Sequence, residues 1–385
     1  MPSESPASEP NPKVVRHTID PEGDVILVLS NPGAPFAPWN PDEDHPCAVK
    51  LPEELQEDFP LDIYFLLSAG SKKAKVTADI DSGKKTAVNG QQAATTDSDS
   101  AGSNEKKTIE IRYRVNSACL RLASPYFKKL FSGSWRETIT KKKDLFYVTA
   151  QDWDPTALLL LMNIFHCQGQ KILWNIDLEM LAKIAALADY YLCATYIRHY
   201  AMRWRERLDI DLSKATHSRP ALLLLFSAIT FEWDDTFTKL TAAIMWHSRE
   251  PIQTLGLPFP QPILDAINNR RVERLDQIAE AIAKTKQFLK VRAPCSVFEC
   301  TVLRHGVFRV DIHSKKIHPK QIKECKDGYS IAEVLNAFNN LREPRWQGTV
   351  LRAGEHYRCK ISLAARLPAS VTDRLPGLQI TIFKK

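Results

Sequence analysis

The sequence predicts an α+β protein: a small sheet with stacked short helices, followed by an α-helical extension and a small mixed C-terminal module. Short β-branched or alternating runs at positions 25–29 and 109–115 are typical of strands. From residue 117 onward the apolar side chains follow a helical period. With 385 residues and 44% hydrophobic side chains, the chain is long enough for two or three domains with true cores.

The N-terminal part supplies the strands. Residues 25–29 form a continuous aliphatic run with turn-forming residues on both sides, which indicates a buried strand. Residues 61–68 form a second strand-like run, and in residues 109–115 apolar and charged side chains alternate, as in a half-buried strand. Residues 1–16 are polar and rich in proline, so we expect a disordered tail there.

A long insertion separates the first strand from the rest of this part. Residues 31–60 combine many prolines with acidic side chains, a composition that prevents regular structure. Residues 69–107 carry almost no large apolar side chains, so they cannot bury enough surface to offset the entropy of ordering. We therefore expect a proline-rich acidic loop followed by a disordered insertion.

Capping signals mark the helices. Ser124-Pro125 and Asp154-Pro155 each place a capping side chain before a proline at the first helical position, and Asp177 also precedes a helical stretch. We expect helices over residues 117–122, 125–131, 155–166, 178–192 and 193–207, with a short strand at 145–148. A second helical region is expected over residues 220–230, from a cap at Asp234 or Asp235 to residue 246, and over residues 263–289.

From Asp24 to Trp204, the chain resembles a BTB/POZ domain, specifically the insertion-bearing form common in fungal proteins. The densest part of the resemblance is Ala123-Ser124-Pro125-Tyr126-Phe127 with Leu130-Phe131, and Leu187-Ala188-Asp189-Tyr190-Tyr191-Leu192-Cys193 is similar to the family's fourth-helix segment. One departure is Asn116, where the family usually has a histidine that packs with the segment at Asp24. The helices over residues 226–289 resemble the extension that follows this domain in the same group.

These observations divide the chain into a tail at 1–16, a BTB/POZ domain with insertion at 17–207, a helical extension at 208–290 and a C-terminal module at 291–385. The resemblance implies a non-enzymatic interaction protein that forms a homodimer or recruits protein partners. For some relatives it implies service as an adaptor for a cullin-type ubiquitin ligase. It also implies that Phe127, Leu130, Phe131 and Tyr191 pack in the core, with part of this helix surface meeting a partner chain.

No motif in the sequence signals catalysis. Phosphate-binding glycine loops, the H-E-x-x-H motif and the G-x-S-x-G motif are all absent from the sequence. The pair Asp152 and Asp154 is better explained by a turn and a helix N-cap than by acid–base chemistry. His166 and His199 lie near expected helix ends, where a packing or dipole role is the simpler interpretation.

One set of residues has the composition of a metal site. Cys295 and Cys300 are close in the sequence, as are His356 and Cys359, and cysteine and histidine are the ligands of structural zinc. A module with modest apolar content and irregular strand and helix signals, including residues 331–338 and 378–383, often needs a metal or a larger neighbour. Metal-free packing of these four side chains is the alternative interpretation, and Cys325, His305, His313 and His318 are alternative ligands.

Charge and targeting signals narrow the partners and the location. Residues 1–60 hold three lysines and arginines against twelve acidic residues, whereas residues 101–150 hold eleven against four. The basic stretches Lys72-Lys73, Lys106-Lys107 and Lys141–Lys143 allow an alternative function, a nuclear regulator that binds nucleic acid, although solvated surface is their simpler interpretation. No signal peptide or membrane-spanning run is seen, so we expect an intracellular protein in the cytoplasm or nucleus, with its eight cysteines as thiols or metal ligands.

Overall fold

The computed structural model describes residues 13–39, 109–133, 140–142, 145–212, 215–291, 297–345, 356–364 and 367–383. Of the predicted insertion, only residues 31–39 are among them, and they contain no helix or strand. The strand expected at 61–68 and the stretch at 69–107 lie outside the described residues. None of the described helices combines the length and the apolar character needed to cross a membrane.

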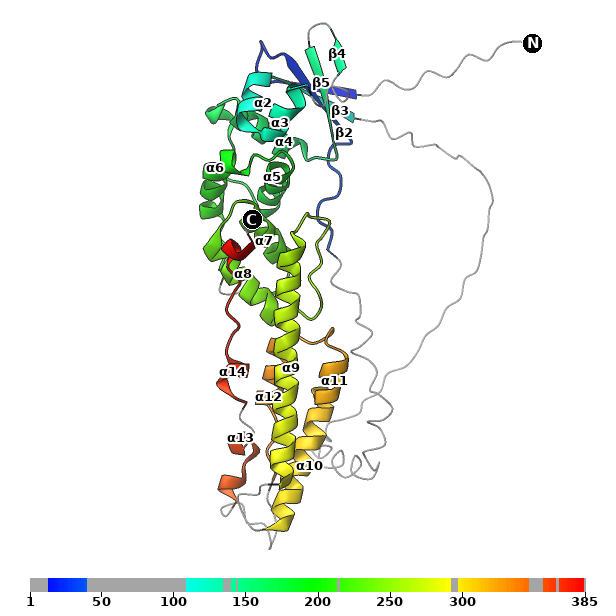
Figure 1. The fold of residues 1–385 in the computed structure, drawn as a ribbon, viewed down its shortest axis with the longest axis vertical. Coiled ribbons are helices and arrows are strands. Elements are labelled where there is room, and N and C mark those ends of the chain that lie inside the picture. Colours follow the sequence, from blue (N-terminus) through cyan, green and yellow to red (C-terminus); the bar gives the residue numbers. More distant parts are fainter. Residues whose placement is uncertain are drawn as a thin grey trace, which may run out of the picture. The chain divides into compact units, whose positions relative to one another are not determined.

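A five-stranded sheet forms the first part of the fold, in the order β1-β3-β2-β5-β4 (Figure 1). Its strands are β1 (Lys13–Thr18), β2 (Val25–Ser30), β3 (Ile109–Val115), β4 (Thr140–Lys142) and β5 (Leu145–Gln151). β3 pairs antiparallel with β2 and parallel with β1, while β2 pairs parallel with β5. The expectation of a disordered tail was wrong for residues 13–16, because β1 pairs with β3 at the sheet edge, a tertiary contact that local composition does not encode.

The side-chain alternation of the sheet follows the sequence pattern. Val25, Leu27 and Leu29 of β2 are fully buried, and the apolar positions of β3 after Ile109 are buried while its charged positions are half-buried. Gly23 precedes β2 where a side chain could not fit, since a Cβ atom there would lie 2.5 Å from the Val115 carbonyl oxygen. The strands predicted at residues 25–29 and 109–115 are therefore confirmed as β2 and β3.

Short helices follow the sheet: α2 (Ser117–Ala123), α3 (Pro125–Phe131) and α4 (Pro155–Phe165) lie next to it, and α5 (Leu178–Tyr190) and α6 (Ala194–Arg207) lie beyond α4 (Figure 1). The predicted caps form as expected. The Asp154 carboxylate accepts hydrogen bonds from the backbone N–H groups of Thr156 (2.9 Å) and Ala157 (3.0 Å), and the Asp177 carboxylate accepts one from Met180 (2.7 Å). The α+β prediction of a small sheet with stacked helices is confirmed.

The remainder of the described chain is helical: α7 (Arg219–Thr230), α8 (Asp234–His247), α9 (Gln261–Val291), α10 (Phe298–Ser314), α11 (Pro319–Glu324), α12 (Ile331–Asn339), α13 (Ile361–Ala364), α14 (Ala369–Thr372) and the 3-10 helices η6 (Tyr357–Cys359) and η7 (Ile380–Phe383). The predicted cap of α8 was wrong: Trp233 occupies the cap position, while Asp234 and Asp235 lie in the first turn. Carboxylates are favoured there by the helix dipole.

Two hydrophobic cores share the helix α9. Ile263, Leu264 and Ile267 at its start belong to the core of the sheet and helices α2 to α8. Farther along, its buried side chains instead pack with α10, α11 and α12, in a second core that contains Leu275, Ile278, Ala279, Ile282, Leu289, Phe308, Ile312, Ile322, Val334 and Phe338. The C-terminal helices therefore bury their apolar side chains against α9. This helix is the larger neighbour that we expected a module of modest apolar content to need.

The last described residues return to α8. The Thr238 hydroxyl donates to the Leu378 carbonyl oxygen (2.9 Å), and the Leu378 N–H donates to the Thr241 hydroxyl oxygen (2.9 Å). A Cβ atom at Gly377 would lie 1.8 Å from the Thr238 carbonyl oxygen, so only glycine fits this approach. The strand-like run at 378–383 forms η7 instead, because its hydrogen bonds go to a helix and not to a sheet.

Candidate metal centre and interaction surface

Three of the four predicted metal ligands lie together. The ligand atoms of Cys300, His356 and Cys359 are all within 4.8 Å of one another. Cys300 lies in the first turn of α10, whereas His356 and Cys359 flank the 3-10 helix η6, whose short turn is closed by the Cys359 N–H donating to the His356 carbonyl oxygen (2.9 Å). The fourth predicted ligand, Cys295, lies outside the described residues.

The chemistry of this donor set fits a soft divalent cation. Two thiol sulfurs and one imidazole nitrogen are the ligands that structural zinc prefers, and two sulfurs each about 2.3 Å from one ion lie at most about 4.6 Å apart. All three side chains are buried, with exposed fractions of 0% for Cys300, 1% for Cys359 and 2% for His356. Burial of all three side chains favours a structural site over a catalytic one.

The alternative ligands do not join this group. Cys325 is in a disulfide, so its sulfur is not available, and the expectation that every cysteine would be a thiol or a ligand was wrong for this residue. Burial, then Lys286, lowers the pKa of His318 to about 4, and burial with basic neighbours lowers the pKa of His305 and His313. Within the described ranges, no second cluster of three metal-ligating side chains occurs.

Structural roles explain three of the residues considered for catalysis: Asp152, Asp154 and His166. Asp154 caps α4 and also contacts the Lys183 ammonium (3.0 Å), while Asp152 accepts a hydrogen bond from the Asn31 side chain in a turn. His166 ends α4: its Nδ1 contacts the Met162 carbonyl oxygen (2.8 Å), and its Nε2 accepts the Asn116 N–H (2.8 Å). A ring with these two contacts is the neutral tautomer, protonated on Nδ1.

Asn116 is the N-cap residue of α2. Its side-chain oxygen accepts the Ala118 N–H (2.9 Å) and its amide donates to Asp20 (3.0 Å). The contact with the Asp24 segment is made instead by Ser117, whose hydroxyl and N–H both donate to the Asp24 carboxylate (2.6 and 2.7 Å). The departure at Asn116 is therefore accommodated without loss of the link between α2 and β2.

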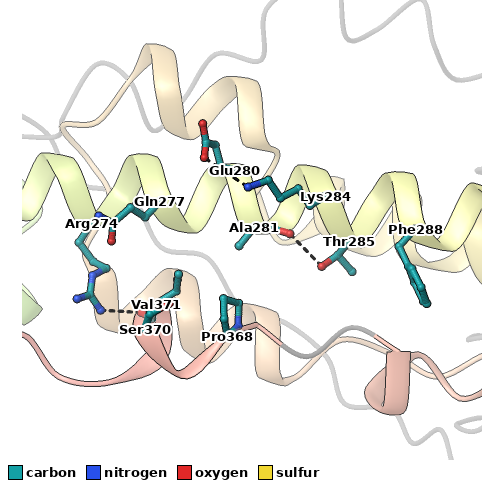
Figure 2. A pocket seen from close by; sticks show the side chains of 10 residues that line it. All are labelled: Arg274, Gln277, Glu280, Ala281, Lys284, Thr285, Phe288, Pro368, Ser370 and Val371. Atoms are coloured by element: carbon teal, nitrogen blue, oxygen red, sulfur yellow. Dashed lines mark hydrogen bonds and ion pairs between the residues drawn. The ribbon is translucent and has the colours of Figure 1, made fainter.

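A groove of about 740 Å³ lies between α9 and α14 (Figure 2). Its polar side chains are engaged with the protein itself: the Arg274 guanidinium donates to the carbonyl oxygens of Val371 and Asp373 (2.9 Å each), and Lys284 pairs with Glu280 (3.9 Å). The lining contains no histidine or cysteine and a single carboxylate. Arg274 therefore holds α14 against α9.

Several apolar side chains on α2 and at the end of α5 are exposed. Leu122 of α2 is 80% exposed, and at the end of α5 Tyr190 and Leu192 are 51% and 55% exposed. The Tyr190 ring contacts Tyr126 (5.5 Å between centroids) and Trp153 (5.3 Å). By contrast, Phe127, Leu130 and Tyr191 are buried and Phe131 is partly buried, as expected for core residues. Exposed aromatic clusters of this kind are enriched at protein interfaces.

The basic stretches that suggested nucleic-acid binding fall mostly outside the described residues. This holds for Lys72-Lys73, Lys106-Lys107 and Lys143, while Lys141 and Lys142 lie in the short edge strand β4. The nucleic-acid alternative therefore stays a sequence-based prediction.

Comparison with known proteins identifies the first folded part. Residues 106–207 match the BTB/POZ domain family. No curated protein and no solved structure matched the chain. The matched range contains β3, β4, β5 and helices α2 to α6, and with them the exposed side chains of Leu122, Tyr190 and Leu192. The segment of this chain from residue 106 to residue 207, packed against the N-terminal strands, thus belongs to the BTB/POZ domain family.

Proposed function

We propose that this chain is a non-enzymatic interaction protein whose BTB/POZ domain mediates self-association or recruits a protein partner. The observation that carries the proposal is the BTB/POZ match over residues 106–207, a type of domain that serves protein–protein interaction. The exposed side chains of Leu122, Tyr190 and Leu192 support it, because apolar groups in water favour association when a partner covers them.

Self-association is tested by size-exclusion chromatography with light scattering on the full chain at micromolar concentration. We expect twice the 43.6 kDa of one chain. Leu122→Glu and Tyr190→Glu should each shift the mass toward one chain, because a buried carboxylate without a partner opposes association. Phe298→Glu is the matched control, since this exposed side chain lies on α10, outside the BTB/POZ range. If the wild type has the mass of a single chain at this concentration, the proposal of self-association is wrong.

Partner recruitment to a cullin-type ubiquitin ligase is a narrower form of the proposal, implied by the family resemblance alone. Sedimentation of the full chain with a purified cullin N-terminal domain tests it directly. We expect co-sedimentation that Tyr190→Glu weakens. If the two proteins sediment separately at micromolar concentrations, the cullin is not a partner. Recruitment of other proteins would still be consistent with that result.

The second part of the proposal is a structural zinc centre held by Cys300, His356 and Cys359, with Cys295 as the predicted fourth ligand. Zinc would connect the start of α10 to η6, two segments more than 40 residues apart in the sequence. Metal binding that exists only in the folded state stabilises that state.

Metal analysis of the full chain purified under reducing conditions tests the centre. We expect about one zinc per chain, and none in the double variant Cys300→Ser, Cys359→Ser. Cys167→Ser is the control, because Cys167 is exposed and is not part of the group. Metal-free wild type, or a double variant that retains its zinc, would refute the centre.

A further inference from the structure

A cavity of about 440 Å³ lies between the edge strand β1 and the helix α4. The 3-10 helix η4 (Gly169–Lys171) and Leu173 complete its lining. The lining residues of α4 are spaced by three or four positions, as on one face of a helix: Thr156, Leu159, Leu160 and Asn163. The cavity therefore follows one face of α4, with β1 as the opposite wall.

Hydrogen bonds to neighbouring elements hold the walls of this cavity in place. Every residue of β1 is in register with a residue of β3. The Tyr113 hydroxyl of β3 donates to the Pro155 carbonyl oxygen (3.1 Å) at the start of α4. The Trp204 indole N–H donates to the Leu173 carbonyl oxygen (2.7 Å). A ligand would thus meet walls that are already formed, which lowers the entropy cost of binding.

The charged side chains in the lining are all basic. Arg16 comes from β1 and Lys171 from η4, and the lining contains no aspartate or glutamate. Within the part of the chain that the structure describes, no carboxylate forms an ion pair with either side chain. His17, Thr18 and Thr156 add further groups that can donate hydrogen bonds. A cavity with two cations and several donors favours a ligand that carries negative charge.

Asn163 places a buried amide in the same lining. Its side chain is only 3% exposed, and its Oδ1 atom has no hydrogen-bond partner. Buried polar groups without a partner are rare in folded proteins because each costs free energy. A half turn of the amide exchanges its oxygen and its NH2 group, so Asn163 can either accept a hydrogen bond or donate one. A peptide group in the ligand offers both kinds of partner.

The rest of the lining is aliphatic and comes from three elements of the fold: Ile19, Leu159, Leu160 and Leu173. Cavities of several hundred Å³ that combine apolar walls with a few polar groups are typical ligand sites. A single water molecule occupies only about 30 Å³ of liquid, so the space suits a larger ligand. The ligand should therefore carry an aliphatic group beside its negative charge.

We propose that this cavity binds a carboxylate attached to an aliphatic group, as at the C-terminus of a peptide that ends in leucine. Arg16 and Lys171 bind the carboxylate. Asn163 forms a hydrogen bond with the adjacent peptide group, and the aliphatic side chain lies against Leu159 and Leu173. A free aliphatic acid has the same carboxylate and carbon chain without the peptide group.

This site goes beyond the proposed function. None of the exposed side chains of Leu122, Tyr190 and Leu192 lines the cavity. Self-association and carboxylate binding therefore use different residues, so each can be tested without the other.

Isothermal titration calorimetry of the full chain at low salt tests the site with three probes. They are acetyl-Gly-Leu-Leu with a free C-terminus, the same peptide with a C-terminal amide, and octanoate. We expect the free peptide acid to bind with a dissociation constant of roughly 10 µM to 1 mM, which its size allows. The amide should bind at least about tenfold more weakly, because it lacks the charge that Arg16 and Lys171 bind. Octanoate separates the two sources: equal or tighter binding assigns the site to a free aliphatic acid, and weaker binding assigns it to a peptide terminus.

Two variants test whether the carboxylate binds in this cavity. Arg16→Gln and Lys171→Gln should each weaken binding of the peptide acid roughly 3- to 10-fold and leave binding of the amide unchanged. Both side chains are exposed, so neither change should prevent folding. Lys128→Gln is the matched control, because it removes an exposed charge on α3 outside the cavity.

Three results would overturn the proposal. The wild type would bind none of the probes at millimolar concentration if the cavity takes up water alone. Equal affinities for the peptide acid and the amide would show that the carboxylate is not recognised. Unchanged affinity of the peptide acid in both Arg16→Gln and Lys171→Gln would show that it binds elsewhere. In each case a dimer seen by light scattering would leave self-association through the BTB/POZ domain standing.

Discussion

Ser124 connects the cap of one helix to the end of another, and its removal gives a quantitative test of the domain's packing. The Ser124 hydroxyl accepts the Phe127 N–H (3.2 Å) at the start of α3 and donates to the Tyr191 carbonyl oxygen (2.6 Å) after α5. The side chain is fully buried, so water cannot replace either contact. Ser124→Ala keeps the backbone and removes only these two hydrogen bonds.

The expected loss follows from the two contacts. Removing an N-cap costs about 1 kcal/mol. Leaving the buried Tyr191 carbonyl without this donor costs about 1–3 kcal/mol more. Ser124→Ala should therefore lower the free energy of unfolding of the BTB/POZ domain by about 2–4 kcal/mol.

The assay is urea unfolding of the full chain followed by far-UV circular dichroism, with hydrogen exchange of the α3 amides as a local readout. Ser132→Ala is the control, because the Ser132 hydroxyl is exposed and donates to the Lys129 carbonyl oxygen (2.9 Å) one turn away. It should cost less than about 0.5 kcal/mol. A loss below that value for Ser124→Ala, or equal losses for both variants, would refute the reasoning.

Two further predictions concern the C-terminal half. Gly377→Ala should detach the last residues from α8 and speed their hydrogen exchange, because the added methyl would lie 1.8 Å from the Thr238 carbonyl oxygen. Gly306→Ala has open space and should instead stabilise α10 by about 0.5–1 kcal/mol, so equal effects of the two changes on thermal stability would contradict this account. The pKa of His318 is lowered to about 4, below its ordinary 6.5, by burial first and then by Lys286. Between pH 6.5 and about 4 the unfolded chain binds this proton and the folded chain does not. The free energy of unfolding therefore decreases as the pH is lowered through this window, and His318→Gln should make it depend less on pH. An NMR titration of His318 with a midpoint near 6.5 would contradict it.

Local chemistry was the part of the fold that the sequence predicted well. The pairs Ser124-Pro125 and Asp154-Pro155 identified the first residues of α3 and α4, since a cap and its proline act over a few residues. The same kind of inference was wrong at Asp234, where the choice between cap and first turn depends on Trp233, a buried side chain in the main core. Helix ends that depend on packing are not encoded in capping residues alone.

Long-range pairing was less accessible from the sequence. Residues 13–16 have the composition of a tail, yet they form a strand because β3 offers them an edge. Cys300 and the His356–Cys359 pair were predicted as candidate metal ligands from residue type and local spacing. That these segments meet could not be derived from the sequence, because the long intervening chain can close in many ways.

The sequence by itself determined the α+β class, the helices and their caps, the BTB/POZ resemblance and the residue types of a metal site, because each of these depends on local patterns. Only the tertiary structure decided that α9 joins two cores and that Cys300, His356 and Cys359 lie within 4.8 Å of one another. The physical reason is that burial and proximity arise from packing between distant segments. The pattern of a helix alone does not tell which of its arginines face water and which, like Arg271, are buried.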